Sequence, residues 1–283
     1  MKLSQEERQS AWKNIVVFLA FTAMLTAFFQ LLIYKTGGRG PYFGLGLSWS
    51  PGIAAILTCL TLKRGLSTIK WNWGDWKWIR AGYTYPFIYC ALIYIPIWLF
   101  GLGGNAFNAA MPFIWSEQTL GGGNSSILGA LLGFLILLTL GLLKVLTTAL
   151  GEEIGWRGFM VWEFRKVASF QTMGIVTGLI WAAWHWPRYF IGTDVVPYDA
   201  IIMFTLNAAP LGVVLAYFAI KSKSLWPAAI MHAGLNLCLG VIFGGLNKAP
   251  EDGDPSNILG IATAIVSIAL AIYYLRRAKK EGL

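Results

Sequence analysis

The chain has 283 residues, of which 57% are hydrophobic and only 12% are charged. Soluble domains usually carry roughly a quarter charged residues, so the composition excludes an ordinary soluble protein and is typical of a membrane protein. The net charge of +9 could suggest nucleic-acid binding. However, the basic residues gather along one predicted membrane face, so we expect anionic membrane lipids as partners and no nucleic acid.

Eight apolar segments bounded by charged or turn residues are predicted to span the membrane. In chain order they are residues 14–34, 43–62, 81–103, 127–164, 170–191, 199–220, 225–246 and 257–275. The first lacks a cleavage signal, so we interpret it as a spanning helix and not as a signal peptide. The fourth is too long for one simple crossing, so we expect it to be tilted, broken or extended beyond the membrane. The predicted fold is an all-α polytopic transmembrane bundle, forming a single integral-membrane domain over residues 1–283.

Eight crossings place both termini on one side of the membrane. Most of the 22 lysines and arginines then lie on that side, which the positive-inside rule identifies as cytoplasmic. The tryptophans of segment 71–78, interleaved with Lys70 and Lys77, are typical of an interfacial belt, with substrate capture as the alternative. The three cysteines, Cys59, Cys90 and Cys238, lie in apolar runs without C-x-x-C spacing, so neither a disulfide framework nor a zinc knuckle is expected.

Ionisable residues are costly within hydrocarbon, so those present often mark function. Glu153 and Arg157 are four residues apart and are predicted to form an ion pair across one helical turn. Glu152 lies about 100° around the helix from Glu153, so one carboxylate can be structural while the other serves chemistry. Gly151 and Gly155 form a small-xxx-small pair that allows another helix to approach closely.

The only two histidines also fall within predicted spans. His185 lies near the far end of its segment, and His232 and Asn236 are four residues apart on one helix face. Counting helix rise from the terminus side puts Glu152, His185 and Asn236 at about 20, 21 and 18 Å, and His232 at about 12 Å. A lone Glu-Arg pair is more typical of a structural contact between helices than of catalysis, and a lone histidine can simply form an interhelical hydrogen bond. Together, however, these groups favour a working site.

Two further polar positions have simpler explanations. Lys144 is expected to snorkel or to be paired near the outer end of its span. Asn207 with Pro210 is expected to mark a local irregularity or an interhelical hydrogen bond.

At these positions the sequence resembles the CAAX-protease and bacteriocin-processing (or self-immunity) family of intramembrane proteases, which includes the CAAX prenyl endopeptidases. The likeness rests on three ordered motifs and covers mainly a catalytic core over residues 127–246. The motifs are Glu-Glu-x-x-x-Arg, at Glu152, Glu153 and Arg157; Phe-x-x-x-His, at Trp181 to His185; and His-x-x-x-Asn or Asp, at His232 and Asn236. Trp181 replaces the usual Phe, but it retains an aromatic ring, so we expect the histidine chemistry to be unaffected.

The resemblance implies that Glu152 and His185 activate a water molecule, while His232 and Asn236 stabilise the oxyanion that forms on the scissile carbonyl. These roles agree with the general principles of base catalysis and oxyanion stabilisation. Glu153 and Arg157 would support the geometry, with Glu153 also able to share in catalysis. Family members are commonly described as metalloproteases, and Glu152, His185 and His232 could supply three ligands to a divalent metal such as zinc. The sequence lacks His-Glu-x-x-His, and we favour metal-independent activation by glutamate.

The predicted function is therefore that of an intramembrane endopeptidase. Its substrate would be a hydrophobic or membrane-tethered peptide or protein, prenylated or not, that reaches the site from the cytoplasmic side. We expect the chain in a prokaryotic cell membrane with both termini cytoplasmic. The alternatives are a proton-coupled transporter, because the same residue types build ion pathways, and a non-catalytic scaffold or bacteriocin immunity protein.

Overall fold

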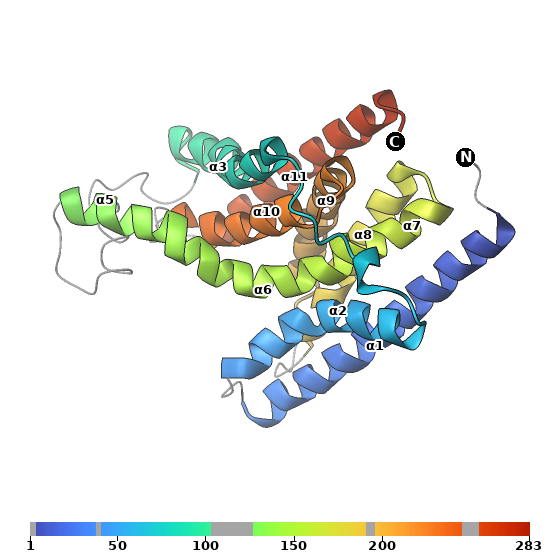
Figure 1. The fold of residues 1–283 in the computed structure, drawn as a ribbon. Coiled ribbons are helices and arrows are strands. Elements are labelled where there is room, and N and C mark those ends of the chain that lie inside the picture. The colour runs from blue at the N-terminus through green and yellow to red at the C-terminus, as the bar shows by residue number, and fades with distance from the viewer. Residues whose placement is uncertain (1–3, 38–40, 103–126, 191–195, 245–254) are drawn as a thin grey trace.

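The computed structural model describes residues 4–37, 41–102, 127–190, 196–244 and 255–283, and within these ranges it contains helices and no strand (Figure 1). The α-helices are α1 (Gln5–Lys35), α2 (Pro41–Thr61), α3 (Trp76–Leu99), α5 (Ile127–Ile136), α6 (Leu142–Gly155), α7 (Val161–Val167), α8 (Phe170–His185), α9 (Tyr198–Ser222), α10 (Trp226–Leu237) and α11 (Pro255–Lys280). Two short 3₁₀ helices accompany them, η1 (Leu66–Thr68) and η4 (Trp186–Tyr189).

The predicted all-α bundle is confirmed, and each of the eight predicted segments corresponds to a helix or to a continuous run of helices. Within the described residues, six helices are long and apolar enough to cross a membrane. The other two segments are shorter: α8 has 16 residues, and the apolar helix Trp226–Ile242 contains α10. These two short helices carry both histidines.

The ends of two helices differ from the predicted boundaries because polar caps extend them beyond the apolar run. Ser4 and Glu7 form a capping box at the start of α1, and Asp75 Oδ1 accepts a hydrogen bond from the Lys77 backbone N–H at the start of α3. Such caps satisfy the free N–H groups of a first helical turn. The polar starts of both helices are therefore helical as well.

The long fourth segment is one continuous helical run of 41 residues, Ile127–Val167. It is interrupted by two π-helical segments, η2 (Leu137–Gly141) and η3 (Trp156–Met160). A third, η5 (Cys238–Ile242), follows α10. A π-helical turn contains one residue more than an α-helical turn, and such turns are frequent at functional sites. Here η3 begins three residues after Glu153.

Glycines bring α2 and α6 into close contact. A Cβ atom at Gly155 would lie 2.5 Å from the backbone of Pro51, and one at Gly151 would lie 2.7 Å from the Trp49 ring. Figure 1 shows α2 beside α1 on one side and beside α6 on the other. The predicted close approach at the small-xxx-small pair is therefore present, and α2 is the helix that makes it.

Both termini lie at the same end of the bundle, which we call the terminus end. Three contacts join the helix ends there: Arg8 Nη2 to Val167 O at 3.5 Å, Gln171 Nε2 to Leu275 O at 3.5 Å, and Lys221 Nζ to Glu281 Oε2 at 2.9 Å. The buried Glu163 carboxylate joins three side chains at this end. It binds Asn14 at 2.8 Å, Arg64 at 2.9 Å and Lys166 at 2.7 Å. That this end is cytoplasmic stays a prediction.

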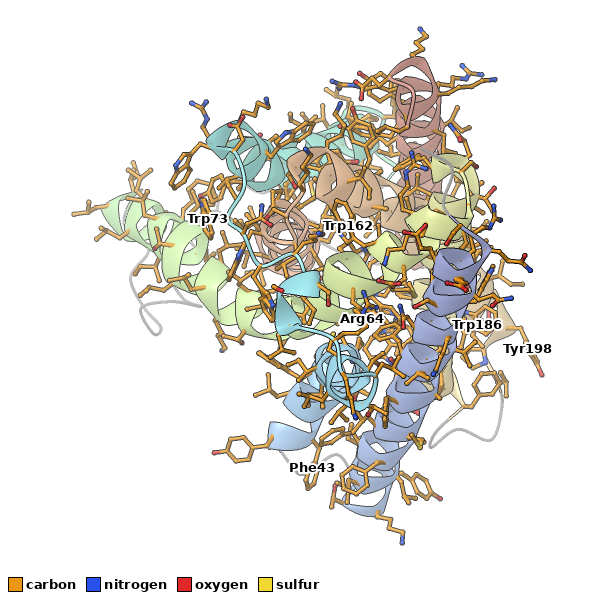
Figure 2. All side chains as sticks on the ribbon, turned by 45° about the vertical axis from the view of Figure 1, so that its right-hand side comes forward. Phe43, Arg64, Trp73, Trp162, Trp186 and Tyr198 are labelled. Carbon is orange, nitrogen blue, oxygen red and sulfur yellow. The ribbon has the colours of Figure 1, made fainter. Side chains whose placement is uncertain are left out.

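Large apolar side chains project outward around the bundle, as in a protein surrounded by lipid (Figure 2). Three of the tryptophans predicted to form an interfacial belt are exposed: Trp71 by 38%, Trp73 by 42% and Trp76 by 64%. Trp226 joins them, because its indole N–H donates to Trp71 O at 2.9 Å. Trp78 instead packs edge-on against Phe218, so it belongs to the interior.

Lys144, Asn207 and the three cysteines have simple surroundings in the structure. The side chain of Lys144 is exposed. Asn207 Nδ2 donates to Met203 O at 2.9 Å, which is a bond within α9 and not the expected interhelical bond. Pro210 lies inside the same helix. The three cysteines are free and buried.

Candidate active site

The two adjacent glutamates end α6 and point to different partners. Glu153 Oε1 accepts a hydrogen bond from Arg157 Nη1 at 2.8 Å, so the predicted ion pair is present, and both side chains are almost fully buried. Glu152 Oε2 instead accepts a hydrogen bond from the Trp181 indole N–H at 2.9 Å. The 100° step between neighbouring helical residues thus separates two carboxylates with different surroundings.

Glu153 also reaches across the bundle to α10. Its Oε1 lies 2.9 Å from His232 Nδ1, and a carboxylate can only accept, so His232 carries its proton on Nδ1. This bond fixes the orientation of the imidazole ring. Sequence reasoning linked Glu153 to Arg157 alone. The second bond was missed because it joins residues 79 positions apart.

His185 ends α8 and is held by its own helix. Its Nδ1 lies 3.0 Å from Trp181 O, and because a carbonyl oxygen only accepts, Nδ1 is the donor. The Nε2 atom of a neutral His185 ring therefore carries a free lone pair. The ring packs against Trp184 at 4.6 Å and Phe204 at 4.9 Å between centroids.

The predicted residues come together around one cavity of about 690 Å³. Glu152, His185, His232 and Asn236 all line it, although they belong to three different segments of the chain. Glu152 and His232 are buried, while Asn236 is exposed. Asn236 follows His232 by one helical turn and faces the open part of the site.

The cavity lies in the part of the bundle away from the terminus end. Gln30, Gly44, Ser48, Arg188 and Leu259 also line it, and each lies in the part of its helix away from that end. The counted depths agree, because they place the predicted site residues about 20 Å into a core about 30 Å thick. That a substrate reaches the cavity from the cytoplasmic side stays a prediction.

The three residues predicted as metal ligands do not form a metal-binding group. Among the described residues, no group of three His, Cys, Asp or Glu side chains is arranged to hold a metal ion. Glu152 Oε2 and His232 Nδ1 bind Trp181 and Glu153. Binding of a divalent metal by Glu152, His185 and His232 stays a prediction, and we derive no step through a metal.

Comparison with known proteins supports the motif assignment. A family model described as type II CAAX prenyl endopeptidase Rce1-like matches residues 134–238, a range that contains all three motifs. Residues 134–238 are thus similar to the Rce1-like endopeptidases. The predicted resemblance is thereby confirmed for this Rce1-like segment, while the first three spanning helices lie outside it.

A curated relative agrees with the family match. The protein called CAAX prenyl protease 2 from Methanococcus maripaludis is 29% identical over 104 residues. That alignment covers 34% of this chain and 38% of the relative. The chain therefore aligns with little more than a third of the relative's length.

Proposed function

We propose that the chain is a membrane-embedded endopeptidase that hydrolyses a peptide bond in a hydrophobic or membrane-tethered substrate. The observation that carries the proposal is that Glu152, His185, His232 and Asn236 line one cavity within the Rce1-like segment. The name of the archaeal relative, CAAX prenyl protease 2, supports a peptidase. It also makes a prenylated substrate the first one to test.

In the proposed reaction, the Glu152 carboxylate and the free Nε2 of His185 hold a water molecule. Glu152 takes a proton from this water as its oxygen attacks the scissile carbonyl carbon. A carboxylate in an apolar site exchanges protons more readily near neutral pH than an exposed one does. Glu152 then gives the proton to the departing amine as the carbon–nitrogen bond breaks.

The oxyanion formed in the attack needs donors already in place. His232 is suited to this task because Glu153 binds its Nδ1 and so supports a protonated ring with Nε2–H as donor. Asn236 offers a side-chain amide N–H from the same helix and the same cavity. Arg157 would hold the Glu153 side chain in place.

The test uses the full chain in lipid nanodiscs with reporter peptides that are prenylated, acylated or unlipidated. We expect cleavage by the wild type, and loss of at least about 100-fold in Glu152→Gln and His185→Ala. Mass spectrometry of the products locates the cleaved bond. Equal cleavage by the wild type and both variants would overturn the assignment of these residues.

A second measurement separates the proposal from its alternatives. Substrate binding without cleavage would favour a scaffold, and proton flux into liposomes that Glu152→Gln abolishes would favour a transporter. Neither outcome is expected.

A further inference from the structure

Position 181 is where this chain departs from the family motif that it resembles. The motif has Phe before the histidine, whereas this chain has Trp181. Both side chains are aromatic and apolar, but only the indole carries an N–H donor. The substitution therefore adds one hydrogen-bond donor to the site.

That donor is directed at the proposed general base. Trp181 Nε1 lies 2.9 Å from Glu152 Oε2, and both residues are buried, with 6% and 7% of their surface exposed. A hydrogen bond to a charged group in such surroundings is stronger than one between neutral groups. It occupies one carboxylate oxygen and limits rotation of the carboxylate.

The indole ring cannot turn freely, because several groups of the site surround it. The Arg157 guanidinium lies over its face, 4.5 Å from the centroid. The rings of His185 and His232 contact it edge-on at 5.6 and 5.2 Å. Its own backbone oxygen binds His185 Nδ1. One residue thus touches four of the groups that the proposed reaction uses, which are Glu152, Arg157, His185 and His232.

We propose that Trp181 is a positioning residue: its indole N–H holds the Glu152 carboxylate in the orientation in which that carboxylate accepts a proton from water. The inference rests on the proposed function of Glu152. It assigns to Trp181 a role that a Phe at the same position cannot perform.

The central variant is Trp181→Phe, which restores the residue of the motif, keeps an aromatic ring and removes the N–H. The matched control is Trp156→Phe. Trp156 is 1% exposed, follows the glutamates on the same helical run, and its Nε1 has no hydrogen-bond partner among the described residues. We expect Trp181→Phe to lower kcat by about 10-fold to 100-fold with little change in KM. Trp156→Phe should leave both unchanged.

A phenyl ring is smaller than indole, so a second variant keeps the shape. Replacing Trp181 by 3-benzothienylalanine substitutes sulfur for the N–H group and retains the bicyclic ring. We expect the same loss of kcat as in Trp181→Phe. Activity equal to that of the wild type in this variant would overturn the proposal.

Two readouts distinguish positioning from packing. In the Glu152→Gln background, adding Trp181→Phe should lower kcat by less than about twofold, because the carboxylate that Trp181 positions is already gone. In ¹⁵N-indole NMR spectra, the Trp181 resonance should move in Glu152→Gln while the Trp156 resonance stays. An unmoved Trp181 resonance, or independent kcat losses, would contradict the proposal.

Failure of the inference is distinguishable from failure of the proposed function. If Glu152→Gln cleaves as well as the wild type, the function assigned to Glu152 is wrong. If Glu152→Gln loses at least about 100-fold and Trp181→Phe behaves like Trp156→Phe, only the role of Trp181 is wrong.

Discussion

Glu153 should be the residue whose truncation most destabilises the bundle. It is fully buried, and its Oε1 binds both Arg157 Nη1 at 2.8 Å and His232 Nδ1 at 2.9 Å. Glu153→Ala leaves a buried guanidinium without its counter-charge, which typically costs about 3–5 kcal/mol. Arg157 keeps its contact with the Trp181 ring, which is worth up to about 2 kcal/mol when desolvated. We therefore expect about 3 kcal/mol.

Glu153→Gln should cost less, about 1.5 kcal/mol, because an amide oxygen in place of Oε1 can still accept both hydrogen bonds and only the negative charge is lost. Its activity should nevertheless fall at least about tenfold, since a neutral amide does not support a protonated His232. The free energy of unfolding is measured by titrating the purified full chain from mild detergent into dodecyl sulfate. Activity is measured on the peptide that the wild type cleaves.

The chain supplies a matched control with the same four-residue spacing. Arg277 and Glu281 also form an ion pair at 2.9 Å, but their side chains are 43% and 26% exposed. Exposed pairs contribute about 0.2–1 kcal/mol, so Glu281→Ala should cost less than about 1 kcal/mol. If Glu153→Ala and Glu281→Ala destabilise the chain equally, burial does not set the cost and the reasoning is refuted.

Three further predictions follow from local features. Gly155→Ala should destabilise the bundle by about 1–3 kcal/mol, because the added Cβ atom would meet the Pro51 backbone. Gly240→Ala is the control: its Cβ atom would have no neighbour within 4 Å, so this variant should be neutral in the same unfolding titration. Arg277 and Lys221 lower the pKa of Glu281 from 4.5 to about 2, so the stabilisation of the fold by the Glu281 carboxylate is present above pH 4.5 and is lost as the pH falls towards 2. The difference in melting temperature between wild type and Glu281→Gln should therefore shrink over that pH range. A growing difference would contradict this assignment. Peptide cleavage should survive dialysis against a chelator, because Glu152, His185 and His232 form no metal-binding group among the described residues; loss of cleavage that zinc restores would refute this expectation.

The fold could be predicted from the sequence because hydrocarbon imposes a length and a composition on each helix. The apolar runs located every helix that carries a motif. The helix starts were less predictable, because the capping residues Ser4 and Asp75 lie outside the apolar runs that hydropathy detects. The π-helical segments η3 and η5 were not predicted, since apolar composition does not distinguish a π turn from an α turn.

Local spacing identified part of the site and could not identify the rest. The four-residue interval between Glu153 and Arg157 predicted their ion pair directly. The bonds from Glu153 to His232 and from Glu152 to Trp181 join different helices, and they depend on how α6, α8 and α10 pack. The departure from Phe to Trp at position 181 was the available signal, but it was interpreted only as a retained aromatic ring.

The π-helical segments also set which changes of chain length the site can tolerate. A π turn takes up one residue more than an α turn, so removing one residue from η3 would convert it to an α-helical turn and leave the following residues close to their present orientation. A deletion in an α-helical part of the same run, between Glu152 and Glu163, would instead rotate the following residues by about 100°. Glu163 would then turn away from Asn14 and Arg64, its partners at the terminus end. The α-helical parts of this run should therefore tolerate a change of length less well than its π turn does.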